Sequence, residues 1–270
     1  MLLAIDIGNS SISLGLFDTA TADLLHTFKL SPESCRTSDE CAVLISSMLS
    51  LSGFSVKDID GAMLASVVPQ LTHTLVNTVV KLIGKPPLTV GPGIKTGFPI
   101  KIDYPSELGA DLVADTAAVL SIQGRSMHGT NRKAAIIVDM GTATTVSAIN
   151  RAGEYVGTAI MPGVRVSLDA LHAETAQLPT VTPSAPERAI GKNSRDAVRS
   201  GVILGNAIMI DGLIDRFEKE LKLDKGDAEV YATGGLAELI IPACKRSMIH
   251  EPHLTLKGLY RIYINNSDKA

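Results

Sequence analysis

The stretch Leu2-Leu3-Ala4-Ile5-Asp6-Ile7-Gly8-Asn9-Ser10 is an apolar run that delivers an acidic residue into a turn of glycine, amide and hydroxyl side chains. Half a chain later the pattern returns, where a second apolar run ends in Asp139-Met140-Gly141-Thr142-Ala143-Thr144-Thr145. Glycine lets a backbone bend and come close to a ligand. Turn N–H groups and hydroxyls then donate to anionic oxygens while the carboxylate faces a cation. The repeat therefore predicts a duplicated fold that closes around one nucleotide.

The composition is that of a globular protein rather than a disordered or fibrous one. Of the 270 residues, 45% are hydrophobic and 20% are charged, and this length favours one large domain or two medium ones. The formal net charge of -3 comes from 25 basic and 28 acidic residues without a long run of one sign. We therefore expect small-molecule or protein partners, and neither a nucleic-acid surface nor a membrane surface.

The N-terminal segment and the cysteines indicate a cytoplasmic protein. Residues 1–6 contain no basic n-region, and Asp6 interrupts the apolar run far short of a signal-peptide core. No apolar stretch approaches the roughly 18 residues that span a bilayer. Cys35, Cys41 and Cys244 are odd in number and lack CxxC spacing, which favours reduced thiols over a disulfide framework or a zinc site.

Strand and helix patterns alternate along the chain. The repeated turns each join two short apolar segments, which predicts β-hairpins at 2–7 with 12–17 and at 134–138 with 144–149. Further strands are expected at 61–67 and 230–233. Helices are expected at 41–51, 72–83, 108–122, 166–174 and 194–218. This alternation predicts an α/β fold with mixed sheets, because the hairpins are antiparallel.

Glycines interrupt the longest expected helix at positions 201, 205 and 212. The spacing of four between Gly201 and Gly205 permits close helix packing, through which subunits can also meet. Three common catalytic or nucleotide motifs are absent. The segment Gly91-Pro92-Gly93-Ile94-Lys95-Thr96 lacks the glycine that precedes lysine in a P-loop, and no GxGxxG or GxSxG motif is present.

A single Asp-x-Gly turn is weak evidence for function, because a plain hairpin turn explains most of them. Two copies favour nucleotide binding, particularly since Gly234-Gly235 follow a third strand, where a helix N-terminus could approach a nucleotide. The pattern resembles that of the superfamily of acetate kinases, sugar kinases, heat-shock chaperone ATPases and actin.

Further motifs narrow the resemblance to type III pantothenate kinases, and they cover nearly the whole chain. Besides the two repeated turns, they are Pro105-Ser106-Glu107-Leu108-Gly109-Ala110-Asp111, Ile160-Met161-Pro162-Gly163, Gly191-Lys192-Asn193-Ser194, Thr233-Gly234-Gly235 and Leu254-Thr255-Leu256-Lys257-Gly258-Leu259.

The resemblance implies two ribonuclease H-like (actin-like ATPase) domains with mixed β-sheets flanked by helices. We place them at residues 1–118 and 119–270, with a final strand that packs back toward the first domain. The implied activity is ATP-dependent phosphorylation of pantothenate to 4'-phosphopantothenate, the first step of coenzyme A biosynthesis. The implied cofactors are ATP with Mg²⁺ and a monovalent cation, K⁺ or NH₄⁺, and the implied assembly is a homodimer.

The resemblance also places the ATP and cation contacts. The expected loop for the β- and γ-phosphates is Asp6, Ile7, Gly8, Asn9, Ser10, Ser11, Ile12 and Ser13. Within it, Asp6 would hold magnesium directly or through water. Phosphoryl transfer needs positioning and charge neutralisation more than covalent catalysis. In the second hairpin the resemblance places the monovalent cation on Asp139 and an ATP contact on Thr142, and a turn residue at a strand end is the alternative for Asp139.

Asp111 matches the general base of the family, which accepts the proton of pantothenate's primary hydroxyl as that oxygen attacks the γ-phosphorus. Partial burial at the start of an apolar helix would raise its pKa toward useful basicity. A carboxylate that only stabilises the helix N-terminus is the alternative. The resemblance assigns substrate binding to Gly109, Ala110, Asp111, Leu112 and Ser194. A helix N-cap is the alternative role for Ser194.

Several positions depart from the family pattern. Leu112 replaces an arginine expected to contact pantothenate, and leucine supplies neither a charge nor a forked donor. Asp115 stands where asparagine is usual, Ser147 where aspartate is frequent, and Ile102 where tyrosine is often found. The departures concern the acceptor side more than the phosphate side. They leave a second hypothesis, a nucleotide-binding paralogue with weak or no kinase activity and a regulatory or interaction role.

Overall fold

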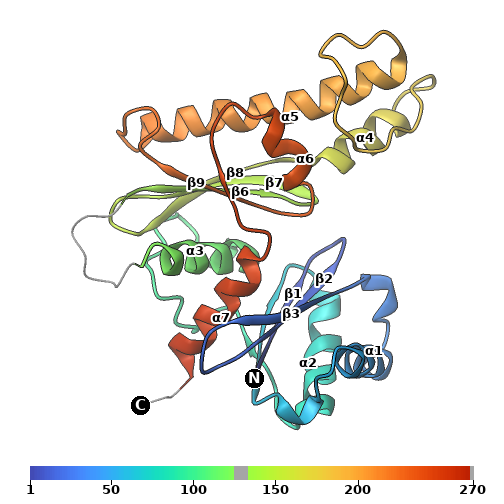
Figure 1. Ribbon diagram of the computed structural model, residues 1–270. Helices are drawn as coiled ribbons and strands as arrows, with labels where there is room; N and C mark the ends of the chain where they lie inside the picture. Colours follow the sequence, from blue (N-terminus) through green and yellow to red (C-terminus); the bar gives the residue numbers. More distant parts are fainter. Residues whose placement is uncertain (125–132, 268–270) are drawn as a thin grey trace. The chain divides into compact units, whose positions relative to one another are not determined.

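The computed structural model describes residues 1–124 and 133–267, and the chain divides into two compact units (Figure 1). The first unit comprises Met1–Pro99, Asp103–Met127 and His253–Ala270, and the second comprises Ile100–Ile102 and His128–Pro252. The division expected from the sequence placed the boundary at residue 118, which lies inside helix α3 (Ala110–Ile122). The compact units keep α3 whole and return the last helix of the chain to the first unit.

The first unit contains a five-stranded mixed sheet with the order β3-β2-β1-β4-β5. The strands are β1 (Leu2–Ile7), β2 (Ile12–Phe17), β3 (Leu24–Leu30), β4 (Gly61–Ser66) and β5 (Leu88–Thr89). The hairpin β1–β2 and the pair β2–β3 are antiparallel, whereas β4 runs parallel to β1 and β5 runs parallel to β4. The central strand β1 is apolar on both faces except at Asp6, because helices cover both faces of the sheet.

Two helices cover the face of this sheet that carries Leu3, Ile5 and Ile7. They are α1 (Ser38–Leu51), which begins at a capping box between Thr37 and Glu40, and α2 (Pro69–Ile83), which ends at Gly84 in the left-handed conformation with φ 75°. Short 3-10 turns η1 (Pro32–Ser34) and η2 (Val56–Asp58) flank α1. Helix α7 (Leu254–Asn266) contacts β1, β2 and β4, and α3 contacts β4 and α7.

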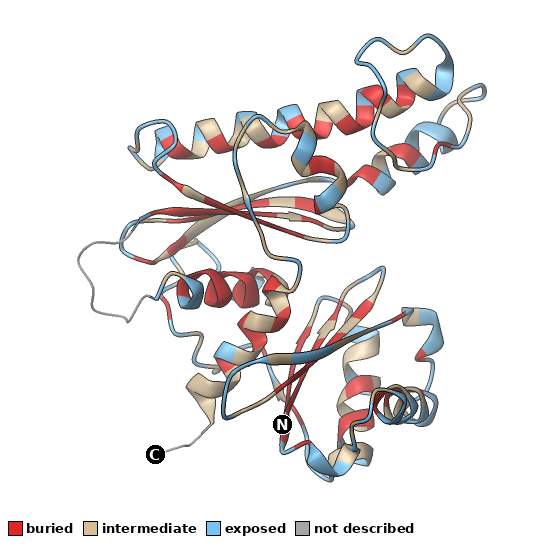
Figure 2. Cartoon of the chain, in the orientation of Figure 1, coloured by how far each residue is buried: buried red, intermediate tan, exposed pale blue. Residues whose placement is uncertain are grey.

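Helix α3 follows the 3-10 turn η3 (Pro105–Glu107) and is the most completely buried helix of the first unit (Figure 2). Every residue from Leu112 to Leu120 is buried. Ala114, Ala117 and Ala118 keep its surface narrow, so neighbouring elements can approach the helix closely. The buried run begins directly after Asp111.

The second unit repeats the plan with a five-stranded mixed sheet of order β10-β9-β6-β7-β8. The strands are β6 (Ala135–Met140), β7 (Ala143–Ile149), β8 (Tyr155–Pro162), β9 (Glu229–Thr233) and β10 (Ile249–His250). Helices α4 (Val164–Ala173), α5 (Ser194–Glu220) and α6 (Ala237–Ile240), with the 3-10 turn η4 (Ile241–Ala243), pack on the face that carries Ile136, Val138 and Val146. Mixed sheets flanked by helices are therefore confirmed in both units.

Both repeated hairpins and the five expected helices are confirmed, with small shifts of their ends. Strands β3, β5, β8 and β10 were not expected. The final strand expected from the sequence is wrong, because that segment forms helix α7. Leu254, Leu256, Leu259 and Ile262 are buried on one side of this helix. Their spacing fits the helical period rather than the alternation of a strand.

Among the described residues, α5 is the one helix that is long and apolar enough, by length and composition, to cross a membrane. Its most apolar stretch of 18 residues has a mean hydropathy of 1.4, and 44% of that stretch is buried. This differs from the expectation that no stretch approaches such a length. Val198, Val202, Ile210 and Ile214 of α5 pack into the core of the second unit. The core helix of a globular unit accounts for this apolar character.

Cys35 and Cys41 are joined by a disulfide bond, with their Cα atoms 4.8 Å apart. The expectation of reduced thiols is therefore wrong for this pair. The chain turns at Thr37 into α1, which brings the first turn of that helix back beside Cys35 although the spacing is not CxxC. Both cysteines are 0% exposed. Cys244 is free, and burial, together with nearby Asp211, raises the pKa of its thiol to about 12.

Candidate functional site

The first repeated turn joins β1 to β2 and has the geometry of a compact loop. The Gly8 N–H donates to the carbonyl of Ser11 at 3.0 Å, and a Cβ atom at position 8 would lie 3.3 Å from the same oxygen. Asn9 and Ser10 between them are exposed. Asp6 pairs with Ser13 across the two strands, so their side chains lie on the same face of the sheet.

Asp6 lies on the face of the first sheet that α7 covers. Successive side chains of a strand alternate between the two faces, so Asp6 shares its face with Leu2 and Ala4, opposite to the α1–α2 core. Gly15 and Phe17 on the same face of β2 both meet residues of α7. Asp111 is carried by α3, which packs on α7. In the first unit, therefore, the side chain of Asp6 and the helix of Asp111 lie on the same side of the sheet.

Asp111 occupies the first turn of α3, behind Gly109 at the N-cap position. The Leu112 N–H donates to its Oδ1 at 2.8 Å. A Cβ atom at position 109 would collide with that same oxygen, so the carboxylate fills the space that a glycine leaves. Burial raises the pKa of the Asp111 carboxyl above its usual value, although the N–H groups of Leu112 and Asp111 act in the opposite direction. A raised pKa suits a proton acceptor.

The positions beside Asp111 explain part of the departure from the family pattern. Leu112 is only 7% exposed and belongs to the buried run of α3. Leucine at this position therefore contributes to packing of the helix. Near the departure at Ile102, a tyrosine is present two residues later, at Tyr104 just before η3, and it is 66% exposed. Asp115 is buried one turn after Asp111 and accepts a hydrogen bond at 2.7 Å from the Thr255 hydroxyl of α7.

The second repeated turn joins β6 to β7 with the same construction. The Gly141 N–H donates to the carbonyl of Ala143 at 3.1 Å, and Asp139 pairs across the strands with Thr145. In both units, therefore, an acidic residue near the end of one strand faces a hydroxyl residue on the next. Thr142, at the tip of the second turn, is exposed. The sequence predicted the two turns, and the structure adds their hydroxyl partners.

Two glycines from other elements close around the second turn. Gly163, where β8 leads into α4, donates its N–H to the Thr142 carbonyl at 3.2 Å, and a Cβ atom there would collide with that carbonyl. Gly234, after β9, has φ +99°, and a Cβ atom there would collide with Oδ1 of Asp139. The carboxylate of Asp139 is therefore held against backbone. These contacts give physical roles to the Met161-Pro162-Gly163 and Thr233-Gly234-Gly235 motifs.

Hydroxyl groups cluster on the face of the second sheet that carries Asp139. The cross-strand pairs place Thr145 and Thr233 beside Asp139, and Ser147 two residues further along β7. The Ser147 hydroxyl donates to the Thr158 hydroxyl at 3.1 Å, whereas Oγ1 of Thr145 is buried without a hydrogen-bond partner. The opposite face of the same strands forms the apolar core. Sequence analysis did not single out Thr145, although its alternation with Ser147 could have indicated this face.

Ser194 begins α5, but the N-cap is its neighbour Asn193, whose side chain accepts from the Asp196 N–H at 2.9 Å. The alternative role of Ser194 as the cap is therefore wrong. Gly191 packs against the first turn of α5, where a Cβ atom would collide with the backbone of Ala197. The Gly191-Lys192-Asn193-Ser194 motif thus builds the start of this helix and leaves the Ser194 side chain exposed.

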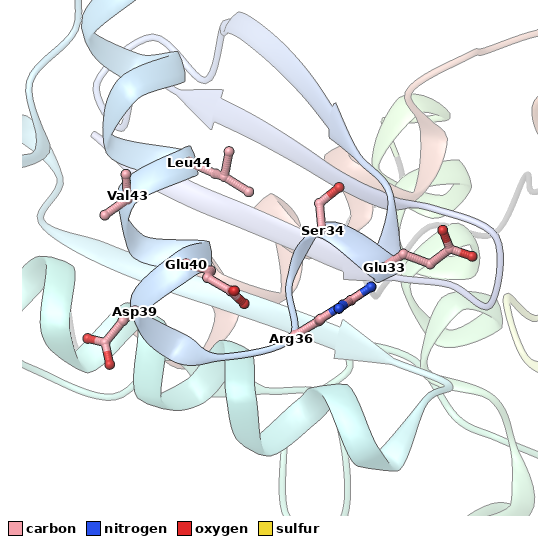
Figure 3. A pocket seen from close by; sticks show the side chains of 7 residues that line it. All are labelled: Glu33, Ser34, Arg36, Asp39, Glu40, Val43 and Leu44. Carbon is pink, nitrogen blue, oxygen red and sulfur yellow. The ribbon is translucent and has the colours of Figure 1, made fainter.

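A groove on the first unit lies away from these residues (Figure 3). It is lined by Glu33, Ser34, Arg36, Asp39, Glu40, Val43 and Leu44, from η1, α1 and the segment between them. Helix α1 packs on the face of the first sheet opposite to Asp6. None of the site residues expected from the sequence lines the groove.

The expected site residues thus form two sets. Asp6 to Ser13 and Gly109 to Leu112 belong to the first unit, whereas Asp139, Thr142 and Ser194 belong to the second. Among the described residues, no group of three or more histidine, cysteine, aspartate or glutamate side chains could by itself hold a metal. The oxygen-rich donors of each set suit hard cations and phosphate groups rather than zinc.

Comparison with solved structures shows that the chain shares its fold with several of them. A Sinorhizobium meliloti protein provisionally assigned as a 2-dehydro-3-deoxygalactonokinase superimposes with a TM-score of 0.59 at 9% identity, over 100% of this chain and 98% of that one. The ethanolamine utilization protein EutJ from Carboxydothermus hydrogenoformans gives a TM-score of 0.53 at 14% identity, over 96% and 89%. The fold expected from the resemblance is confirmed.

Comparison of the sequences is more specific. The family model described as type III pantothenate kinase matches residues 2–216. A type III pantothenate kinase from Moorella thermoacetica is 41% identical over 267 residues, which cover 99% of this chain and 100% of that protein. One from Thermobifida fusca is 40% identical over 268 residues, with 99% and 100% coverage. The chain belongs to the family of type III pantothenate kinases.

Proposed function

We propose that the protein transfers the γ-phosphoryl group of ATP to the primary hydroxyl of pantothenate, giving 4'-phosphopantothenate in the first step of coenzyme A biosynthesis. The observation that carries the proposal is Asp111, a carboxylate with a raised pKa on the same side of the first sheet as Asp6. Family membership and full-length identity of about 40% support the substrate.

In this proposal the loop from Asp6 to Ser13 binds the β- and γ-phosphates. Asn9 and Ser10 are exposed residues of this turn, and we assign their donors to anionic oxygens of ATP, with the tight Gly8 turn keeping the backbone close. We assign a further ATP contact to Thr142, which is exposed at the tip of the matching turn. The chain's contribution is positioning and donation of hydrogen bonds rather than covalent catalysis.

The donors present fit a magnesium ion that accompanies ATP. Asp6, with the Ser13 hydroxyl opposite it, offers oxygen ligands, and magnesium is commonly bound by one or two carboxylates together with substrate phosphates and waters. When bound, the ion neutralises the charge that develops on the phosphate oxygens. Asp6 would hold it directly or through water.

The donors of the second unit fit a monovalent cation. The carboxylate of Asp139 lies against Gly234, and the buried Oγ1 of Thr145, opposite it across the strands, lacks a hydrogen-bond partner. A hydroxyl oxygen left unpaired in a folded protein is a ready ligand for K⁺ or NH₄⁺ beside a carboxylate. We infer that Asp139 and Thr145 bind this cation.

On the acceptor side, Asp111 takes the proton of the primary hydroxyl as its oxygen attacks the γ-phosphorus. The Leu112 N–H donates to Oδ1 and so fixes the orientation of the carboxylate that receives the proton. Gly109 gives the carboxylate room to pack against the start of the helix, and we assign Ser194, whose side chain is exposed, to substrate binding as well. Buried Leu112 contributes through packing, so recognition of the pantothenate carboxylate falls to other groups.

We further propose that the protein is a homodimer that pairs through α5. Gly201, Gly205 and Gly212 open onto empty space on this helix, since a Cβ atom at any of them would meet nothing within 4 Å. Ile208, on the same side by helical spacing, is 66% exposed, and neighbouring Met209 is 43% exposed. A second copy of α5 laid on this stripe would cover the two apolar side chains and use the glycines for close approach. We also propose that the protein is cytoplasmic.

The alternative, a nucleotide-binding paralogue without kinase activity, is not favoured. Asp6, Asp111 and Asp139 are all retained, and the close relatives are named as kinases over their full length. The departures at Asp115 and Ser147 carry hydrogen bonds within the fold, to Thr255 and Thr158, so they have structural explanations.

A coupled assay tests the function directly. The purified protein, given ATP, Mg²⁺ and pantothenate in either KCl or NaCl, should release ADP only when pantothenate is present. Asp111→Asn should lower kcat by a factor of about 100 or more while ATP binding measured by calorimetry stays within about twofold. Asp224→Asn, an exposed aspartate of the second unit, is the matched control and should leave kcat unchanged. Turnover by Asp111→Asn at the wild-type rate would remove Asp111 from its role.

A further inference from the structure

Helix α7 contacts the strands that hold the phosphate loop and the helix that holds the proposed base. It packs on strands β1 and β2, which hold the phosphate loop, and on α3, which holds Asp111. The helix is encoded far from both of them, after the whole of the second unit. A single rigid element therefore connects the phosphate loop to the base.

Helix α7 packs on the sheet at two glycines and one aromatic residue. A Cβ atom at Gly15 of β2 would lie 3.1 Å from Cδ1 of Leu256, and one at Gly61 of β4 would collide with the hydroxyl of Tyr263. The ring of Tyr260 stacks on Phe17, with 4.9 Å between ring centroids. Glycine at these sheet positions lets the helix sit close to the strands. The fit leaves α7 little freedom to shift along the sheet.

The opposite partner, α3, is held by an equally close contact. A Cβ atom at Gly258 would collide with the carbonyl carbon and oxygen of Ala114. The two helix backbones therefore touch three residues after Asp111. Any larger residue at position 258 would push the two helices apart.

A partly buried hydrogen bond joins the same turns of α7 and α3. The Thr255 hydroxyl donates to Oδ1 of Asp115 at 2.7 Å, and Asp115 is 1% exposed. Thr255 and Gly258 lie three residues apart on one side of α7, and Asp115 lies one turn after Asp111 on α3. A hydrogen bond to an oxygen of a buried side chain is strengthened by the low local dielectric.

We propose that α7 is a brace that sets the position of Asp111 relative to the phosphate loop, and that Thr255 is a positioning residue for phosphoryl transfer through its bond to Asp115. The inference rests on the proposed role of Asp111 as the base. In-line transfer depends on how the base is placed relative to the attacking oxygen. A misplacement of about 1 Å can lower the rate about a hundredfold. A partial loosening of one turn should cost less.

The test compares Thr255→Val, which keeps the shape and removes the donor, with Thr255→Ser, which keeps the donor. Thr255→Val should lower kcat about tenfold while KM for ATP and calorimetric ATP affinity stay within about twofold. Thr255→Ser should restore kcat to within about twofold of the wild type. Thr255→Ala, which removes the donor without adding bulk, provides the second variant if the valine protein fails to fold.

Thr116→Val is the matched control. Thr116 is 0% exposed and follows Asp115 on α3. Its hydroxyl donates at 2.8 Å to the Leu112 carbonyl of α3 itself and not to α7. This variant should lose a buried hydroxyl and some thermal stability while kcat stays within about twofold of the wild type. It separates a general loss of stability from a loss of positioning.

Three results would overturn the brace. They are a wild-type kcat for Thr255→Val and Thr255→Ala, a serine variant as slow as the valine variant, or an equal loss of kcat in Thr116→Val. If these occur while Asp111→Asn is inactive, the proposed base stands and only the brace fails. If Asp111→Asn itself keeps the wild-type kcat, the base and the brace that rests on it are both overturned.

Discussion

Arg246 and Glu218 form a bidentate ion pair inside the second unit, with Nη2 2.6 Å from Oε1 and Nη1 2.8 Å from Oε2. Their side chains are only 12% and 2% exposed. Glu218 also accepts from the N–H groups of Gly226 and Ala228, at the entrance to β9. Burial alone would raise the pKa of Glu218, but the hydrogen bonds from Arg246, Gly226 and Ala228 outweigh it and hold the pKa below its usual value. The pair ties the end of α5 to the sheet.

Removing Arg246 should therefore destabilise the protein strongly, because it leaves a buried carboxylate without its cation. We expect Arg246→Met to lower the free energy of unfolding by about 3 kcal/mol, measured by urea denaturation. Lys225→Met is the control, since Lys225 pairs with Asp215 at 2.7 Å but is 74% exposed, and it should cost less than about 1 kcal/mol. Equal losses in the two variants would contradict the assigned burial of the pair.

The disulfide between Cys35 and Cys41 should stabilise the first unit by closing a short loop. Its reduction by dithiothreitol should lower the free energy of unfolding by about 2 kcal/mol, as the loop-closure entropy of so few residues implies. The double variant Cys35→Ser with Cys41→Ser should show a comparable loss and no further response to the reductant. Cys244→Ser should still respond, because Cys244 takes no part in the bond. An unchanged denaturation midpoint after full reduction, verified by mass, would refute this contribution.

The raised pKa of Asp111 should appear in the pH dependence of turnover. Only the carboxylate accepts a proton, so activity is present above the pKa and falls as the pH drops through it. Because burial lifts the pKa above its usual 3.8, the acidic limb of kcat/KM should have its midpoint above that value. Asp111→Glu, if it retains activity, should shift this limb. A limb at or below pH 3.8 in the wild type would contradict the assignment.

Thr145→Val should separate cation binding from folding. The buried Oγ1 of Thr145 has no hydrogen-bond partner, so replacing it by a methyl group should leave stability in cation-free buffer unchanged or slightly raised. In KCl the variant should gain less thermal stability than the wild type and need more K⁺ for half-maximal turnover. Thr145→Ser keeps the hydroxyl and should behave like the wild type. An equal KCl-dependent gain in the wild type and the valine variant would exclude Thr145 as a ligand.

Ile208→Glu should dissociate the proposed dimer without unfolding the chain. A charge placed at the centre of an apolar helix contact is costly, whereas the 66% exposed Ile208 side chain contributes little to the core of its own unit. Sedimentation velocity should show a monomer for Ile208→Glu with an unchanged circular dichroism spectrum. Ile190→Glu, at an 81% exposed position before α5, is the control and should remain dimeric. A dimer in both variants would place the contact elsewhere.

The repeated turns and the α/β alternation were predictable because they depend on short-range pattern, an apolar run that ends in Asp-x-Gly. Strand β3 was not, since six of its seven residues are exposed or only partly buried, and the polar, charged and aromatic side chains at 26–29 obscure the period of two. The pairing of Cys35 with Cys41 depends on a local turn that spacing alone did not reveal. The roles of Gly163, Gly234 and Gly258 depend on what lies across the fold, which no window of sequence contains.

The order of segments along the chain has a consequence for synthesis. Because α7 follows the second unit in sequence, a growing chain has already produced every other element of the first unit long before the helix that covers Asp6 and α3 exists. During that interval the apolar side of β1 and α3 lacks its partner and is exposed to water or to chaperones. If α7 braces Asp111 as proposed, the base reaches its working position only once α7 has been made and has folded back, and we expect chains that lack α7 to be inactive.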